Sequence, residues 1–337
     1  MKLRMNTGLL QWLCCVWILL ATCVTVAIPP ARGQTLSQSY PTQPIRVIVP
    51  TGSGSAPDVV MRSLAQKLSL RLGQPVVVEN RPGAAGMIGA NTVAKAPRDG
   101  YTLLLAWDGV MAINPLLYKE IGYAPLKDFV PVAAVGRVEF VLVAHPTFPA
   151  NSVRELIELA KARPGRINYA SAGTGEVHHI AMEALKSQAG IDLTHIAYKG
   201  GPAALNDVLG GHVPIGFIGL TPALAHLRIG KLKALGVLGM ERVRQLPTVP
   251  TLGETLPGYA IDGSWLALFA PAGTPEVIVR KLGTDLNELI RTDEFSSFLA
   301  EQGIAPLQIS QQGLSQLVRD DTVRFRKIIE QAHIRLD

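Results

Sequence analysis

Short apolar segments alternate with amphipathic stretches along most of the chain. Nine segments have the length and β-branched content of buried strands: 45–49, 76–78, 102–106, 138–144, 167–170, 194–198, 213–218, 232–238 and 266–270. Between them, apolar residues recur at helical spacing in three clear stripes: Val59, Leu64, Leu68 and Leu72; Val153, Leu156, Ile157 and Ala160; and Leu282, Leu286, Leu289 and Ile290. Strands that alternate with helices predict an α/β fold built on largely parallel sheets.

The length and charge of the chain limit its possible functions. At 337 residues it is long enough for two domains, each with its own hydrophobic core. It holds 32 basic and 26 acidic residues, but Lys2, Arg4 and Arg32 fall in the first 33 residues, which contain no acid. The remaining 29 basic and 26 acidic residues form no basic stripe, which argues against nucleic acid as the main partner.

The first 33 residues have the layout of a secretory signal peptide. Lys2 and Arg4 precede a charge-free run over 12–28, and a small-residue segment over 31–33 follows two prolines. We predict cleavage after residue 33 or after Ala27, and export to the periplasm. An uncleaved membrane anchor is the alternative, because ~17 apolar residues reach the lower limit for crossing a bilayer.

All the cysteines of the chain lie inside this segment. They are Cys14, Cys15 and Cys23. The position of Cys23 suggests a lipoprotein cleavage site, but Thr22 is a poor residue immediately before such a cysteine. We therefore expect a mature protein without lipid, disulfide or cysteine metal ligand.

Three turns that follow predicted strands are rich in glycine and other small residues: 51–58, 83–86 and 171–175. Backbone N–H groups at such helix starts lack internal acceptors, and the helix dipole there favours an anion. Each turn therefore predicts contact with an oxygen anion. Plain helix capping is the alternative, with Ser55 as N-cap and Asp58 complementing the dipole. Open α/β sheets bind ligands at the carboxyl ends of their strands, which favours the anion site.

Motifs of the common enzyme classes fit poorly. Pro57 stands where a dinucleotide fingerprint needs its third glycine, and neither Ser53 nor Ser171 lies in a Gly-x-Ser-x-Gly elbow. The adjacent His178 and His179 lack the i, i+4 spacing of a helical zinc site. We predict a surface position for His178 and, for His179, either a helix start or a ligand donor. Accordingly, no catalytic residue, cofactor or metal is predicted.

Several strings of residues, spread in order over the whole mature chain, point to one family. They are 40–50 (YPTQPIRVIVP), 73–83 (GQPVVVENRPG), 99–104 (DGYTLL), 113–115 (INP), 198–201 (YKGG), 246–251 (LPTVPT) and 268–275 (LFAPAGTP). With these strings the chain resembles the Bug family of extracytoplasmic solute receptors. Members of that family are the substrate-binding components of tripartite tricarboxylate transporters.

The resemblance implies a two-lobed periplasmic binding protein of type II, with a mostly parallel sheet in each lobe. Lobe one would comprise 34–138 plus 260–337 and lobe two 139–259, with crossings near Phe140 and Leu266. Such a receptor, expected as a monomer and not an enzyme, closes around a small carboxylate and delivers it to a membrane permease. One alternative is a sensing receptor whose closed form contacts a sensor-kinase ectodomain. Another is an exported enzyme, for which no nucleophile and base pair is evident.

The resemblance also implies where the ligand lies. Backbone N–H groups of 53–56 and 173–175 would hold carboxylate oxygens, and the hydroxyls of Ser53, Ser171 and Thr174 would donate further hydrogen bonds. The candidate ligand-binding residues are Thr51, Ser53, Gly54, Ser55, Ala56, Asp58, Trp107, Asp108, Ser171, Gly173, Thr174, Gly175, His179, Lys199, Gly200 and Gly201.

Some of these positions carry open alternatives or depart from the family. Asp58 would orient its loop or accept from a ligand ammonium group, while Lys199 either adds positive potential or lies on the surface. Ser55 replaces a usual glycine, residues 218–219 are Ile-Gly where an Asp-Asn pair is frequent, and Trp107 stacks on a flat ligand or fills core. These departures favour a ligand with less amine character, such as an aromatic or apolar monocarboxylate.

Overall fold

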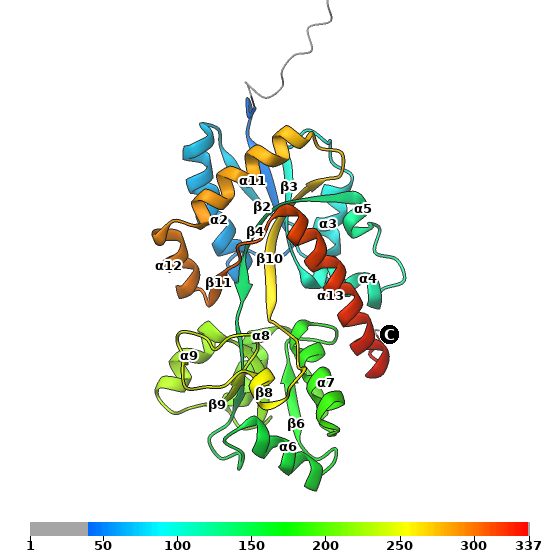
Figure 1. Ribbon diagram of the computed structural model, residues 1–337, viewed down its shortest axis with the longest axis vertical. Coiled ribbons are helices and arrows are strands. Elements are labelled where there is room, and N and C mark those ends of the chain that lie inside the picture. The colour runs from blue at the N-terminus through cyan, green and yellow to red at the C-terminus, as the bar shows by residue number, and fades with distance from the viewer. Residues whose placement is uncertain (1–39, 336–337) are drawn as a thin grey trace, which may run out of the picture. The chain divides into compact units, whose positions relative to one another are not determined.

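The computed structural model describes residues 40–335. The predicted signal peptide over 1–33, with its three cysteines, lies outside the described residues. A membrane-spanning segment is not found among the helices of the described range. Two β-sheets with helices packed on both faces make up the core of this range (Figure 1).

Six strands form the first sheet, in the order β11-β4-β10-β3-β1-β2. Their bounds are β1 (Ile45–Val49), β2 (Val76–Asn80), β3 (Thr102–Trp107), β4 (Phe129–Val138), β10 (Ser264–Pro271) and β11 (Ile304–Pro306). β1 pairs in parallel with β2 and β3, whereas β10 runs antiparallel to both β3 and β4, and β11 runs antiparallel to β4. The carboxyl ends of β1, β2 and β3 therefore meet at one edge.

Five strands form the second sheet, in the order β7-β6-β8-β5-β9. Their bounds are β5 (Phe140–Ala144), β6 (Asn168–Ser171), β7 (Thr194–Ala197), β8 (Ile215–Gly219) and β9 (Lys233–Val237). β6 pairs in parallel with β7 and β8, and β5 is antiparallel to β8 and β9. The prediction of mostly parallel sheets was wrong in this detail: both are mixed, because β10 and β11 in the first sheet and β5 in the second run against the other strands.

Helices cover both faces of the first sheet, because its strand residues are apolar on each face. Ile48, Leu104, Ala106 and Phe269 pack on one side against three helices: α3 (Met87–Ala94), η2 (Gly109–Ile113) and α13 (Gln311–Gln331). The opposite side carries a packed pair, α2 (Ala56–Leu72) and α11 (Glu276–Ile290). The shorter helices are η1 (Ala84–Gly86), α4 (Asn114–Leu117), α5 (Pro125–Asp128) and α12 (Asp293–Glu301).

Helices also cover both faces of the second sheet, and successive residues of its strands face opposite sides. Leu142 and Phe217 face α6 (Val153–Ala162) and α7 (Val177–Ala189). Val141 and Ile218 face the other way, toward α8 (Gly201–Leu209) and α9 (Leu220–Arg228). A short helix, α10 (Leu252–Thr255), packs beside α6. This period-2 pattern of burial on both faces explains the nearly continuous apolar sequence of β5 and β8.

The predicted helical stripes are correct except at the start of α2. Val59 is exposed, whereas Val60 and Met61 are buried with Leu64 and Leu68. The helical period explains the difference, because positions three and four residues before Leu64 share its face and a position five residues before it does not.

A single predicted strand over 138–144 is in fact the junction of two strands. β4 ends at Val138 in the first sheet and β5 begins at Phe140 in the second, so Glu139 alone separates them. The remainder of β4 was missed because it contains Pro131 and Gly136, which usually mark breaks in strands. Register shifts opposite β10 accommodate the irregular strand.

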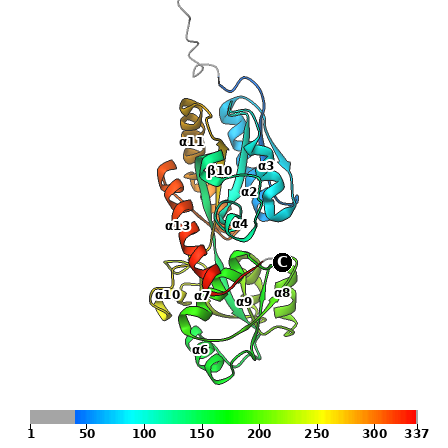
Figure 2. The same ribbon diagram turned by 90° about the vertical axis from the view of Figure 1, so that its right-hand side faces the viewer.

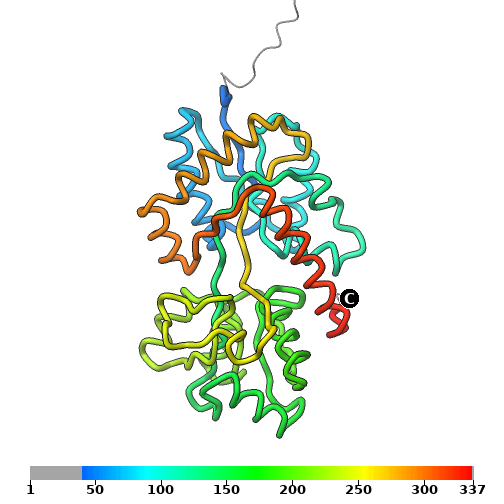
Figure 3. Tube along the Cα trace, in the orientation of Figure 1, coloured from blue at the N-terminus to red at the C-terminus, as the bar shows by residue number. Residues whose placement is uncertain are grey.

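The chain passes from the first sheet to the second at Glu139 and returns through the segment between β9 and β10 (Figure 3). Helix α13 then packs against both groups of elements. Leu314 and Val318 belong to the core of the first sheet, while Phe325 and Ile329 belong to the α6 and α7 side of the second. α13 lies beside α7 in two views (Figures 1 and 2). α13 therefore joins the two sheets by side-chain packing, in addition to the two chain crossings.

A buried hydrogen bond fixes α13 to the first sheet. The indole N–H of Trp265, in β10, donates to the Asp321 carboxylate over 2.8 Å, and both residues are buried. We predict that Trp265→Phe lowers the free energy of unfolding by about 1–3 kcal/mol, because a buried carboxylate oxygen loses its donor. Urea denaturation measures this. Val323→Ala, at a position 71% exposed on the same helix, should change it by less than about 0.5 kcal/mol. Equal stability of Trp265→Phe and the parent protein would contradict the assignment.

Candidate functional site

The turn between β1 and α2 is organised around a buried carboxylate. Asp58 is only 2% exposed, and its Oδ2 accepts from the Gly54 amide over 2.8 Å and from Arg62 Nε over 3.0 Å. Its Oδ1 accepts from Asn80 Nδ2 over 2.8 Å. Burial by itself would raise the pKa of Asp58, but the hydrogen bonds from Arg62, Gly54 and Asn80 outweigh it and lower the pKa. The hydrogen bonds of the ionised Asp58 carboxylate thus stabilise the conformation of its own loop.

Some of the backbone N–H groups in the turn over 51–58 that were predicted to hold a ligand carboxylate are already bonded within the protein. The Gly54 amide is bound to Asp58, and the Ser55 amide donates to the Gly52 carbonyl over 3.3 Å. The hydroxyls of Thr51 and Ser55 bond each other over 2.6 Å. For the amides of Ser53 and Ala56, the described part of the chain offers no hydrogen-bond acceptor.

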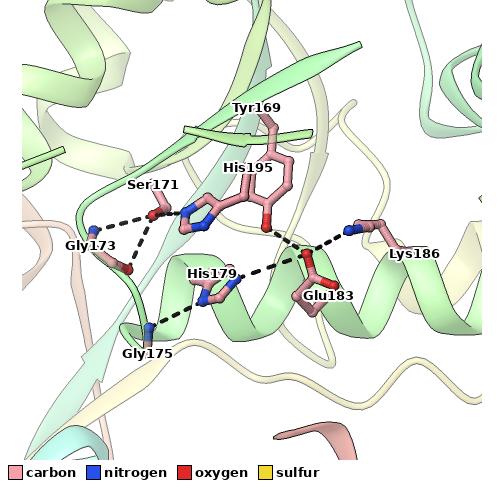
Figure 4. A network of polar contacts seen from close by, with 8 residues as sticks. All are labelled: Tyr169, Ser171, Gly173, Gly175, His179, Glu183, Lys186 and His195. Atoms are coloured by element: carbon pink, nitrogen blue, oxygen red, sulfur yellow. Dashed lines mark hydrogen bonds and ion pairs between the residues drawn. The ribbon is translucent and has the colours of Figure 1, made fainter. Parts of the chain in front are cut away.

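The turn between β6 and α7 is held by side chains that lie behind it (Figure 4). Ser171 is fully buried, and its Oγ accepts from the Gly173 amide over 3.2 Å and donates to the Gly173 carbonyl over 3.1 Å. The same oxygen lies 2.6 Å from His195 Nε2. With its own proton directed at the carbonyl, Ser171 accepts from His195. The Gly175 amide donates to Nδ1 of His179 over 3.1 Å.

Two histidines and a tyrosine stack beneath this turn. The rings of His179 and His195 are 3.9 Å apart and nearly parallel, and Tyr169 stacks on His195 at 4.9 Å. Tyr169 and Lys186 both donate to Glu183 Oε1, over 2.7 and 2.8 Å (Figure 4). Burial lowers the pKa of His179 to about 3, with the nearby His195 and Lys186 acting in the same direction. Burial also lowers the pKa of His195. Both rings are therefore neutral at pH 7 and act as structural supports.

Two other histidine and lysine predictions have clear outcomes. The surface position predicted for His178 was wrong: its ring packs edge-on against Phe140 at 4.6 Å, and burial lowers its pKa to about 4. Lys199 is exposed in the turn between β7 and α8, without an ion pair among residues 40–335. The Gly200 amide of that turn donates to the Ala172 carbonyl over 2.9 Å, so it fixes one turn to its neighbour. Gly201 begins α8.

A small hollow joins the carboxyl ends of strands from both sheets. Its accessible volume is about 20 Å³. Residues after β2 and β3 and residues after β6 line it: Ala85, Trp107, Gly109, Asn114, Leu117, Tyr118, Thr174, Gly175 and Glu176. Of the predicted site residues, Trp107, Thr174 and Gly175 are therefore brought together here. The turn over 51–58 and the turn over 199–201 do not line this hollow.

Sequence reasoning missed most of the other residues in this hollow. Ala85 belongs to the turn over 83–86, which was predicted to contact an anion although none of its residues was named as a ligand-binding candidate. Asn114 belongs to the Ile-Asn-Pro string, to which no role was attached. Ala84 and Ala85 have φ values of 47° and 51°, a left-handed conformation that is costly for alanine. Asn114 is buried, and its Nδ2 donates to the Ala85 carbonyl over 2.9 Å, which stabilises the strained turn.

Asp108 lies behind Trp107 and is 1% exposed. Its Oδ1 accepts from the Gly109 amide over 2.9 Å and from the Ser264 hydroxyl over 2.5 Å, and its buried Oδ2 has no partner in the described chain. Its pKa is raised to about 8, mainly by burial and also by the nearby Asp321 and Glu176, against the opposing effect of the hydrogen bonds from Ser264 and Gly109. Asp108 thus connects the end of β3 to the start of β10 and is largely protonated at pH 7.

Comparisons with known proteins agree with this geometry. Residues 60–334 match the family described as "Tripartite tricarboxylate transporter family receptor". The chain belongs to this receptor family. It is 35% identical to Protein BugT of Bordetella pertussis over 316 residues, covering 93% of this chain and 96% of BugT.

Two solved structures resemble the receptor closely along nearly their full lengths. R. palustris Rpa4515 with adipate has a TM-score of 0.78 at 34% identity, over 88% of this chain and 99% of that one. MatC from Rhodopseudomonas palustris with bound malate has a TM-score of 0.73 at 31% identity, over 86% of this chain and 100% of that one. The predicted family and the two-lobed periplasmic binding protein fold are thereby confirmed.

The conformation of the first turn can be tested with a matched pair of glycines in the receptor. Gly54 has φ of +80°, Gly52 has no such strain, and neither would bring a Cβ within 4 Å of another residue. We predict that Gly54→Ala costs about 1 kcal/mol of unfolding free energy, since alanine disfavours the left-handed region. Gly52→Ala should be neutral or slightly stabilising. Chemical denaturation of both variants measures the difference, and equal stabilities would contradict the positive φ.

The buried histidines predict how receptor stability depends on pH. The pKa of His179 is about 3 in the folded protein and roughly 6.5 when unfolded, so only the unfolded chain takes up its proton between these values. Its stabilisation is complete above pH 6.5 and is lost as the pH falls toward 3. His179→Gln should reduce the slope of unfolding free energy between pH 6 and 4 by up to ~1.4 kcal/mol per pH unit.

His212→Gln is the matched control for this pH series, because the His212 side chain is 74% exposed. It should leave the slope as in the parent protein. A His179→Gln protein with an unchanged slope would show that His179 titrates normally in the folded state.

Proposed function

We propose that the receptor captures a small carboxylate between its two lobes in the periplasm and delivers it to the permease of a tripartite transporter. The observation that carries this proposal is the hollow lined by strand ends of both sheets. Open α/β sheets bind ligands at the carboxyl ends of their strands, and here two such edges face one another. The family description supports the transporter as partner. The predicted signal peptide over 1–33 supports the periplasmic location.

The proposed lobes are 34–138 plus 260–337, and 139–259. Strand membership supports this division, because β5 through β9 all fall within 139–259 and the other strands fall outside it. Glu139 and the segment before Ser264 would act as the hinges. Closure about such short links brings two preformed surfaces together around a ligand.

Donors on both sides of the hollow support an anionic ligand. On the side of the second sheet, Thr174 is exposed, and its amide and hydroxyl have no acceptor within the described chain. On the side of the first sheet, the indole N–H of Trp107 likewise has no acceptor among residues 40–335. The dipole of α7 favours negative charge at this end. The relatives solved with adipate and malate make a dicarboxylate the first ligand class to test.

We infer that the receptor binds its ligand without turnover. The 2.6 Å contact between Ser171 and His195 has the spacing of a nucleophile and base. However, Ser171 is fully buried and its hydroxyl is used within its own turn. A hydroxyl in that position has no route to a substrate, which supports a structural role for the pair.

Ligand-induced stabilisation tests the proposed function. Receptor purified from the periplasm should gain about 2.7 kcal/mol of unfolding free energy at 100 times the dissociation constant of a bound dicarboxylate. Adipate and malate are the first probes, measured by thermal shift and calorimetry. Thr174→Val should weaken binding at least tenfold, because one hydrogen bond to a charged group is worth about 1.5–3 kcal/mol.

Thr194→Val is the matched control, since Thr194 is exposed in β7 and bonds only the Gly165 carbonyl through its side chain. It should bind as tightly as the parent receptor. Absence of stabilisation by any dicarboxylate, tricarboxylate or amino acid would contradict the proposed function.

A further inference from the structure

We propose that the hollow bounded by Trp107, Tyr118 and Glu176 is an ammonium pocket, and that the ligand is a carboxylate that also bears an amino group. This inference rests on the proposed function and specifies the ligand class of the same site. Glu176 would hold the ammonium group, while the neighbouring Thr174 would hold the carboxylate. The assignment reverses the expectation drawn from Ser55, Trp107 and Ile-Gly at 218–219, which together favoured a ligand with less amine character.

Glu176 is the decisive residue because, among the described residues, no basic side chain pairs with its carboxylate and only the dipole of α7 favours its charge. It is the N-cap of α7 but makes no capping hydrogen bond with its side chain. Within residues 40–335, its carboxylate has no ion pair and no hydrogen-bond donor. Burial raises the pKa of Glu176, and its charge in turn adds to the raised pKa of Tyr118. Glu176 is partly buried and lines the hollow, so its carboxylate is positioned to pair with a cation that enters this space.

Two aromatic side chains complete the walls of this pocket. Trp107 and Tyr118 line the hollow together with Glu176. The ring of Trp107 lies against Gly86 and Gly109, where a Cβ would approach it to 3.2 and 2.5 Å. Only glycine leaves room for the indole at these two positions. The faces of aromatic rings attract cations, so two rings and one carboxylate form a suitable environment for an ammonium group.

The charge around the hollow has a single sign. Among the described residues that line it, Glu176 is the only one with an acidic or basic side chain. Behind it, Asp108 interacts electrostatically with Glu176, and its pKa of about 8 keeps it neutral at pH 7. No lysine or arginine lines the hollow. The ligand carboxylate is therefore expected toward the donors of Thr174 and not against Glu176.

The size of the hollow limits which cation fits. About 20 Å³ of accessible volume accommodates one group of the size of water, for which roughly 10–15 Å³ is needed. A primary ammonium group is of this size, whereas a trimethylammonium group is much larger. The pocket therefore predicts selection of primary amines over their trimethylated counterparts.

The experiment compares carboxylates with and without an amino group by titration calorimetry at pH 7.5. The probes are L-aspartate with succinate, L-glutamate with glutarate, and 6-aminohexanoate with hexanoate. The parent receptor should bind the amino member of at least one pair ten times or more as tightly as its partner. Its N-trimethylated form should bind at least tenfold more weakly than the primary amine.

Glu176→Gln should abolish most of this preference, weakening the amino ligand 10-fold or more while the deaminated partner binds equally or better. Glu330→Gln, at an exposed position of α13, is the matched control and should keep the preference. Tighter binding of every deaminated acid, or an unchanged preference in Glu176→Gln, would overturn the ammonium pocket alone. If none of the six acids binds while malate, adipate or another carboxylate does, the ammonium pocket alone is overturned; failure of every carboxylate to bind contradicts the proposed function as well.

Discussion

Side chains that accept hydrogen bonds from backbone amides in the turns after β1 and β6 are the interactions on which the rest of this receptor depends. Asp58 accepts from the Gly54 amide, and His179 accepts from the Gly175 amide. Glycine turns have the greatest conformational freedom of any backbone, and these bonds remove much of it before a ligand arrives. The two acceptors achieve this differently: one is an ionised carboxylate, and the other is an imidazole kept neutral by burial. Because His179 must stay neutral to accept from the Gly175 amide, the receptor loses folding free energy at low pH.

The mixed direction of both sheets follows from how the chain links them. β10 and β5, by which the chain enters the first and the second sheet from the other, run antiparallel to β3 and β8. β4, by which the chain leaves the first sheet, is antiparallel to β10 and so runs in the same direction as β3, and Glu139 is the whole of the first crossing. Because α13 packs on both groups of elements, a movement of one lobe against the other also has to involve that helix. The hydrogen bond of Trp265 to Asp321 fixes its first-sheet half, which leaves the half near Phe325 and Ile329 to follow the second sheet.

The sequence predicted strands and turns correctly where neighbouring residues alone determine the local structure. The bounds of β1 were predicted correctly because an apolar run ends at Pro50, and the small residues of 171–175 correctly marked the turn that contacts the hollow. β4 was missed because Pro131 is tolerated only where a bulge relieves the ladder, a fact set by β10 more than 130 residues later. Glu176 and Tyr118 were missed because their meeting depends on the placement of two sheets. Likewise, nothing in the sequence around Gly54 indicates that its amide donates to Asp58.

The hollow concentrates features that a purely structural site would avoid. Ala84 and Ala85 hold left-handed backbone, and within residues 40–335 Asp108 keeps a buried oxygen without a partner and Glu176 keeps an unpaired carboxylate. The strained backbone and the buried oxygen cost folding free energy, and both lie beside one small space at the junction of two strand edges. The charge of Glu176 contributes to the raised pKa of Asp108, which is largely protonated at pH 7. Among the described residues that line the hollow, Glu176 is then the one acidic side chain in an otherwise uncharged, partly aromatic space. The proposed small cation would pair with this side chain, whereas a ligand without a cation would leave it unpaired.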